Sequence, residues 1–112
     1  MVFERTYRGA VRLVVFDWAG TTVDFGCLAP IRAFIEGFRA KGIDVDERTA
    51  RGPMGMEKRA HIRAVFEDEA VAQAWRRQYG RGVTEADIDA IFDDFVPQLL
   101  GILSRYSTII PG

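Results

Sequence analysis

Three side chains in this sequence of 112 residues have types and spacings that could do chemistry, namely Asp17, Lys58 and His61. Asp17 ends an apolar run over residues 11–16 and opens a loop rich in Gly and Thr. A carboxylate placed at the end of a buried strand can bind Mg²⁺ through oxygen, and it can also attack phosphorus. The simpler alternative is that Asp17 only caps a turn, and the residues around it leave both readings open.

Lys58 and His61 lie three residues apart in a predicted helix, which puts them on one helix face. Only Lys41 and Lys58 are lysines among the fifteen basic residues. A lysine amine can form an imine with an aldehyde, which an arginine guanidinium cannot do. His61 is the only histidine and could move protons for such a reaction. The structural alternative is that Lys58 extends along an apolar stripe and His61 lies on the helix surface.

The elements that must position these residues are predicted by hydrophobic spacing. The β-branched run 11–16 is typical of a strand that is covered on both faces in a parallel sheet. The polar stretch 44–52 is predicted to contain a turn. Ser107 to Ile110 is a short second candidate for a strand. Helices are expected over residues 30–41, 56–66, 68–79 and along a long stretch that follows the N-cap Thr84, where Asp87 completes a capping box and Pro97 should cause a kink. Helical spacing predicts the apolar faces of the first and third of these helices, formed by Ile31, Phe34, Ile35 and Phe38 and by Val71, Trp75 and Tyr79.

Composition excludes several classes of function. The net charge is −1 and there is no basic tract, so a nucleic-acid partner is not expected. The apolar runs are far shorter than the roughly 18–20 residues of a membrane span. Cys27 is the only cysteine, which excludes an intrachain disulfide and favours a cytoplasmic location.

Two motifs carry a resemblance to a known family. The stretch FDWAGTTVD resembles the first motif of the haloacid dehalogenase (HAD) superfamily, whose usual pattern is Asp-x-Asp-Gly-Thr. Ala19 stands here where most HAD phosphatases have a second Asp that protonates a leaving oxygen, so an oxygen leaving group is disfavoured. Residues 50–64, ARGPMGMEKRAHIRA, are similar to the cap signature of the phosphonoacetaldehyde hydrolases, the branch with Ala at this position.

The resemblance implies a fold class and a domain organisation. The complete protein would be an α/β HAD-like protein with a Rossmannoid core, and this chain would supply one core strand and a mostly α-helical cap. Residues 1–29 would be the first core strand and nucleophile loop. Residues 30–104 would be the connecting helix and the helical cap, and residues 105–112 would be a linker returning to a core that this chain lacks.

The resemblance also implies roles for individual residues. Lys58 would form a Schiff base with phosphonoacetaldehyde, Asp17 would attack phosphorus, and His61 could transfer protons. Mg²⁺ would be held by Asp17 and the backbone carbonyl of Ala19. The substrate would also be lined by Met54, Gly55 and Cys27, although Met54 could equally fill the core and Cys27 could be an inert buried thiol.

Further expectations concern activity and assembly. The phosphate-binding and remaining metal-binding residues of the family lie downstream of the cap, so the 112 residues alone are predicted to have no turnover. The cap is expected to form a homodimer, and the edges of strand 11–16 are expected to associate with another chain. Two other functions stay open: a HAD hydrolase of a different phosphoryl or aldehyde substrate, and a non-catalytic helical dimerisation module.

Overall fold

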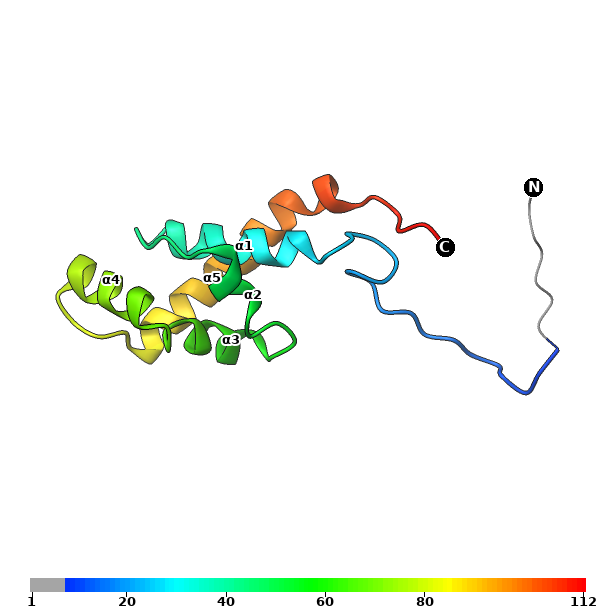
Figure 1. The fold of residues 1–112 in the computed structure, drawn as a ribbon, viewed down its shortest axis with the longest axis horizontal. Coiled ribbons are helices and arrows are strands. Elements are labelled where there is room, and N and C mark those ends of the chain that lie inside the picture. Colours follow the sequence, from blue (N-terminus) through cyan, green and yellow to red (C-terminus); the bar gives the residue numbers. More distant parts are fainter. Residues whose placement is uncertain (1–7) are drawn as a thin grey trace.

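The fold is a helical body from which an extended N-terminal segment leads away (Figure 1). The structure is a computed structural model and describes residues 8–112. Its principal extents are 63 × 28 × 22 Å. In chain order the helices are α1 (Leu28–Arg39), α2 (Glu47–Arg51), α3 (Lys58–Val65), α4 (Glu69–Tyr79), α5 (Glu85–Ile102) and the short 3-10 helix η1 (Leu103–Tyr106).

Helix α1 confirms the predicted apolar face, since Ile31, Phe34 and Phe38 are all buried. It begins two residues before the predicted start because a carboxylate upstream satisfies its first N–H groups. The side chain of Asp24 accepts hydrogen bonds from the backbone of Leu28 at 3.0 Å and of Ala29 at 2.8 Å. Free N–H groups at a helix start are costly when no acceptor is present, so Asp24 sets the boundary.

Asp24 is therefore expected to matter for stability. Replacing it by Ala should lower the free energy of unfolding by about 1–2 kcal/mol, because the helix loses its cap and Ala is strained at the left-handed φ of 54°. Asp24→Asn should lose less, since Asn tolerates this backbone conformation. Chemical denaturation measures both variants. Asp44, which is exposed, provides the matched control, and an equal loss in Asp44→Ala would contradict the assignment.

The stretch 44–52 was predicted to begin with a turn and no helix was predicted in it, but the structure forms helix α2 there. Asp46 caps this helix by accepting the N–H of Thr49 at 2.7 Å, and this bond lowers the pKa of the Asp46 carboxyl. Ala50 is the one buried residue of α2. A single apolar side chain in a polar stretch gives no recognisable helical period, which is why spacing missed the helix.

Helices α3 and α4 agree with the predicted helices but are shorter at their ends. Helix α3 begins at Lys58 because the side chain of Glu57 accepts the N–H groups of the next turn. Helix α4 is capped in the same way by Asp68. The predicted inward face of α4 is confirmed for Trp75 but not for Tyr79, which is 41% exposed.

Helix α5 starts where the sequence predicts it. Thr84 and Asp87 form a reciprocal capping box, and Arg81 pairs with Asp87 at 2.6 Å. These bonds, above all the one from Arg81, hold the pKa of the Asp87 carboxyl far below its usual range. Helix α5 continues through Pro97 to Ile102 without interruption.

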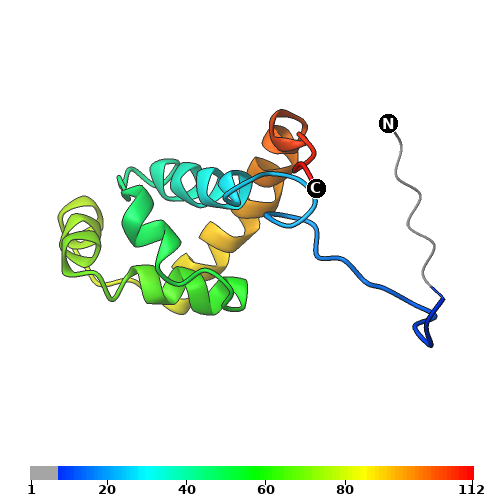
Figure 2. The same cartoon turned by 45° about the vertical axis from the view of Figure 1, so that its right-hand side comes forward.

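The core lies where α1, α3 and α5 pack together, with α4 attached at one end (Figure 2). Helix α5 contacts both α1 and α3. No helix of residues 8–112 is both long and apolar enough to cross a membrane. The buried apolar side chains of the cluster are Ile31, Ala33, Phe34, Ile35, Phe38, Ile43, Val45, Ala50, Ile62, Val65, Phe66, Val71, Trp75, Ile88, Ile91 and Phe95.

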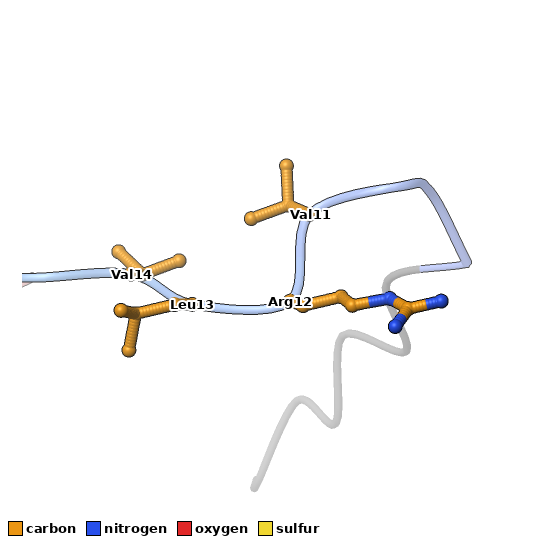
Figure 3. A pocket seen from close by; sticks show the side chains of 4 residues that line it. All are labelled: Val11, Arg12, Leu13 and Val14. Atoms are coloured by element: carbon orange, nitrogen blue, oxygen red, sulfur yellow. The ribbon is translucent and has the colours of Figure 1, made fainter.

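The predicted strand 11–16 is not formed, and this is a correction to the sequence-based expectation. Its side chains are exposed, for example 83% for Val15 and 71% for Phe16. A strand requires a neighbour to bond its N–H and C=O groups, and none of the described residues lies beside this segment. The hollow at residues 11–14 is lined by this one extended stretch only (Figure 3).

The second strand candidate forms a single pairing. Ile109 makes an isolated antiparallel bridge with Val23. Two backbone bonds flank it, from Asp24 N–H to the Thr108 carbonyl at 3.2 Å and from Ile110 N–H to the Thr22 carbonyl at 2.9 Å. The stretch after η1 therefore returns to the loop that carries Asp17.

Candidate active site

Asp17 stands at the start of a tight loop with its carboxylate exposed. The backbone N–H of Trp18 donates to Oδ1 of Asp17 at 2.8 Å, and the Thr21 hydroxyl lies 3.5 Å from Oδ2. The carbonyl of Trp18 accepts the N–H groups of residues 21, 22 and 23, which closes the loop behind the acid. The loop therefore fixes the position of the carboxylate and leaves part of its lone-pair capacity open to a ligand.

Cys27 packs against the inner side of this loop. Its thiol donates to the carbonyl of Ala19 at 3.4 Å. Gly20 has a φ of 78°, and a Cβ built there would lie only 2.4 Å from the sulfur of Cys27. Glycine is thus required at position 20 by both backbone conformation and space.

A pocket of about 530 Å³ adjoins the loop. Asp17 and Ala19 line one side of it, the start of α1 lines a second side, and the end of α5 with η1 lines a third. Leu99 and Leu103 make much of that third side apolar, while Ser104 and Tyr106 bring hydroxyl groups. The lining thus combines two acidic side chains, Asp17 and Asp24, with apolar and hydroxyl groups, and it contains no basic side chain.

The donor atoms at this pocket suit Mg²⁺ in part. Asp17 and Ala19 both line it and offer a carboxylate and a backbone carbonyl oxygen. Mg²⁺ prefers oxygen donors and usually keeps several waters beside one or two carboxylates. No group of three or more Asp, Glu, His or Cys side chains suited to a metal occurs within residues 8–112. The described residues therefore offer two oxygen donors of the kind that Mg²⁺ binds.

Lys58 is the first residue of α3, and its Nζ lies over two aromatic rings. The distance is 5.7 Å to the centroid of Phe34 and 5.8 Å to that of Phe95. In the described part of the chain Lys58 makes no ion pair, whereas Lys41 is bound to Asp94 at 2.9 Å. Among the described residues, the amine of Lys41 thus has a carboxylate partner and the amine of Lys58 has none.

His61 is fully buried, so the alternative of a helix-surface residue is wrong. Its Nε2 lies 2.7 Å from the carbonyl of Ala50, which can only accept, so Nε2 carries the proton. Nδ1 is buried without a hydrogen-bond partner. The ring stacks on Phe34 with centroids 4.0 Å apart, so Lys58 and His61 share one helix face as predicted.

Burial lowers the pKa of His61, and the nearby charge of Lys58 lowers it further, while the bond to Ala50 opposes both effects. The lowered pKa means that His61 resists protonation in the folded protein. Below pH 6.5, the ordinary pKa of histidine, the unfolded chain therefore binds more protons than the folded one. Stability should therefore fall as the pH drops below that value, by at most about 1.4 kcal/mol per pH unit for one proton.

His61→Gln should abolish most of this dependence, because Gln keeps a donor for the Ala50 carbonyl but does not titrate. Urea unfolding measured from pH 7.5 down to pH 5 checks this, since carboxyl groups with ordinary or lowered pKa values stay ionised over most of that range. Equal slopes of unfolding free energy against pH in both proteins would refute the assignment.

Met54 and Gly55 lie in the loop between α2 and α3. Met54 is partly buried and packs against the core cluster, as the core-filling alternative predicts. Gly55 is exposed and has a φ of 94°, a backbone conformation that favours glycine. Neither residue lines the pocket beside Asp17.

The structure places Asp17 and Lys58 in separate clusters and gives no direct contact between them. Arg51, at the end of α2, donates to the carbonyl of Gly26 in the nucleophile loop at 2.9 Å and pairs with Glu47 at 3.0 Å. From the sequence, Arg51 could attract an anionic substrate or be a solvated surface arginine, and its bond to this loop was not predicted. The sequence indicated Phe34 and Phe95 only as apolar positions of predicted helices. Hydrophobic spacing along a helix does not show that Lys58 lies over their rings.

Comparison with known proteins identifies the relatives of this chain. No profile of a known protein family matches it. A phosphonoacetaldehyde hydrolase of Paraburkholderia phytofirmans is 52% identical over 102 residues, covering 91% of this chain and 38% of the relative. One from Syntrophobacter fumaroxidans is 42% identical, covering 99% of this chain and 40% of the relative.

A solved structure agrees with these relatives. The crystal structure of a phosphonoacetaldehyde hydrolase-like protein from Oleispira antarctica matches with a TM-score of 0.83 and 41% identity, covering 99% of this chain and 41% of that one. The sequence and the fold of this chain are thus similar to those of phosphonatase-type proteins, which confirms the resemblance carried by its two motifs. In particular, the chain is homologous to the phosphonoacetaldehyde hydrolases, and it spans about two fifths of the length of these relatives.

Proposed function

We propose that this chain supplies the nucleophile and the imine-forming amine of a phosphonoacetaldehyde hydrolase, which cleaves the carbon–phosphorus bond to give acetaldehyde and phosphate. The observation that carries the proposal is the match of relatives with that name to 91–99% of the chain at 42–52% identity. The free amine of Lys58 and the exposed carboxylate of Asp17 support it.

The first part of the reaction belongs to Lys58. A carbon–phosphorus bond does not break by simple displacement, because an unstabilised carbanion is a very poor leaving group. The neutral amine of Lys58 attacks the aldehyde carbon and forms a C–N bond, and the aldehyde oxygen leaves as water after taking up protons. The product is a protonated imine, whose positive nitrogen can accept an electron pair.

The second part belongs to Asp17. As its carboxylate attacks phosphorus, the electron pair of the carbon–phosphorus bond moves into the carbon chain and neutralises the iminium as an enamine. The phosphoryl group is then an aspartyl-phosphate, which water hydrolyses to phosphate. Protonation of the enamine and hydrolysis of the resulting imine release acetaldehyde and restore Lys58.

Asp17 and the carbonyl of Ala19 are the proposed ligands of Mg²⁺, which when bound would offset the repulsion between the carboxylate and the anionic substrate. His61 is the proposed proton carrier near Lys58, with Nδ1 as its only free ring nitrogen. Met54, Gly55 and Cys27 are retained as proposed substrate-lining residues.

The arrangement of the whole protein is likewise a proposal. It comprises a HAD-like α/β core, begun by residues 1–29, and a cap formed by residues 30–104, with residues 105–112 returning to the core. A cytoplasmic homodimer is proposed, and the apolar side chains of Val96 and Leu100, 45% and 66% exposed on α5, support a dimer contact through the cap.

Reductive trapping tests this function. The chain is incubated with phosphonoacetaldehyde and cyanoborohydride, which adds hydride to an imine carbon and leaves a stable secondary amine. Peptide mass mapping is expected to find a phosphonoethyl group on Lys58, or an ethyl group where the carbon–phosphorus bond broke before reduction. Labelling spread equally over Lys41 and Lys58 would reject the proposal and favour a non-catalytic helical module.

The choice of substrate is tested with the same assay. Propionaldehyde lacks the phosphonate group but offers a similar aldehyde to the amine. With Mg²⁺ present, we expect it to label Lys58 more slowly than phosphonoacetaldehyde does, because Mg²⁺ held by Asp17 and the Ala19 carbonyl would attract the phosphonate group. Faster labelling by propionaldehyde would favour a hydrolase of another aldehyde substrate.

A further inference from the structure

The amine of Lys58 rests on aromatic rings instead of on a carboxylate. Its Nζ lies 5.7 Å from the centroid of Phe34 and 5.8 Å from that of Phe95, within the range in which a ring face attracts a cation. The nearest acid in sequence, Glu57, uses its carboxylate to accept the N–H groups of Arg59 and Ala60. Within the described part of the chain, the two rings are thus what the amine of Lys58 rests on.

The two rings form one rigid surface, here called the aromatic platform (Phe34 and Phe95). Their centroids are 4.7 Å apart at an interplanar angle of 45°. Phe34 is 1% exposed on α1 and Phe95 is 4% exposed on α5, so packing holds both side chains. His61 stacks on Phe34, so the platform also joins the amine to the only histidine. Three helices therefore meet at Lys58.

We infer that Phe34 and Phe95 are positioning residues that hold the Lys58 amine for imine formation, an inference that rests on the proposed function. A carboxylate partner would occupy the N–H groups of the lysine and draw the nitrogen away from an aldehyde. A ring face attracts the charge without a directed hydrogen bond, so the side of the nitrogen facing away from the rings stays open. The amine is neutral while it attacks the aldehyde, but positive charge returns to the nitrogen as the adduct loses water, and the rings stabilise the iminium that forms in this step.

The chain contains a matched control for the platform. Phe92 lies three residues before Phe95 on α5, and the guanidinium of Arg59 stands 5.2 Å from its ring centroid. Arg59 follows Lys58 on α3. The two phenylalanines thus meet neighbouring cations across the same pair of helices, and only Phe95 contacts the reactive amine.

The decisive experiment changes the charge distribution of the ring while keeping its shape. Trifluorophenylalanine at position 95 removes much of the negative potential of the ring face. We expect it to slow the labelling of Lys58 by phosphonoacetaldehyde and cyanoborohydride about fivefold, with little change in melting temperature. The same substitution at position 92 should leave the labelling rate within about twofold of the unmodified chain.

A spectroscopic measurement checks the geometry without any reaction. The ring currents of Phe34 and Phe95 should shift the side-chain methylene signals of Lys58 upfield relative to those of Lys41. Phe95→Leu should reduce this shift, and Phe92→Leu should not. A Phe95→Trp variant should restore the shift and part of the labelling rate, which a loss of packing alone would not explain.

The outcomes separate the platform from the proposed function. If the unmodified chain shows no preference for Lys58 over Lys41, the proposed function is wrong and the platform has no catalytic role. If that preference exists but fluorination and Phe95→Leu leave it unchanged, the inference about the platform alone is wrong. Slower labelling together with a lost ring-current shift supports it.

Discussion

Lys58→Arg is expected to abolish reductive labelling, with a decrease of about 100-fold or more in the adduct found at this position. An arginine keeps the positive charge and can stack on Phe34 and Phe95, so the fold should change little. It has no amine that can attack an aldehyde at neutral pH, so the imine cannot form. Mass spectrometry of the trapped protein measures the loss.

The matched control for this prediction is Lys41→Arg. Lys41 is bound to Asp94 at 2.9 Å, and an arginine can keep that ion pair. Labelling of Lys58 should therefore stay within about twofold of the unmodified chain. The assignment of Lys58 would be refuted if Lys58→Arg were labelled at other positions to the same total extent as the unmodified chain. The reaction would then not be selective for Lys58.

Trp75→Ala is expected to lower the free energy of unfolding by about 3–5 kcal/mol. Trp75 is 2% exposed and is the largest fully buried side chain of the described chain. Its ring meets Phe66 edge-on with centroids 5.2 Å apart and lies 4.2 Å from Tyr79, so it attaches α4 to the rest of the bundle. Truncation leaves a cavity that the surrounding helices cannot fill, and equilibrium denaturation measures the cost.

Two further variants make this prediction specific. The indole Nε1 of Trp75 is buried without a hydrogen-bond partner. Trp75→Phe removes that unpaired donor along with some apolar area, so it should cost much less, about 1 kcal/mol. The other tryptophan, Trp18, is 69% exposed, and Trp18→Ala should change stability by no more than about 0.5 kcal/mol. Similar losses for both alanine variants would contradict the assigned core.

The helices could be predicted from the sequence because their signals are local. The spacing of Ile31, Phe34 and Phe38 predicted the buried face of α1, and the pair Thr84 and Asp87 predicted the start of α5. Both signals act within a few residues of the chain. Helix α2 was missed because Ala50 is its only buried residue, and the start of α1 was missed because Asp24 caps it from four residues upstream.

The expected strand failed for the opposite reason. An apolar, β-branched run indicates that a segment favours burial in a sheet. The backbone hydrogen bonds of a strand, however, must come from another segment. Val11 to Phe16 lack such a neighbour among the described residues and stay extended and exposed. The same limit applies to the pairing of Val23 with Ile109, which joins residues far apart in the sequence.

The sequence by itself determined which residues could do chemistry, because residue type and motif order are properties of the chain. Asp17, Ala19, Lys58 and His61 could all be named before any coordinates. Only the tertiary structure decided their surroundings. Contacts across α1, α3 and α5 bury His61 against the Ala50 carbonyl and set Lys58 on two rings. Burial and ring contacts depend on which helices meet, and hydrophobic spacing leaves that choice open.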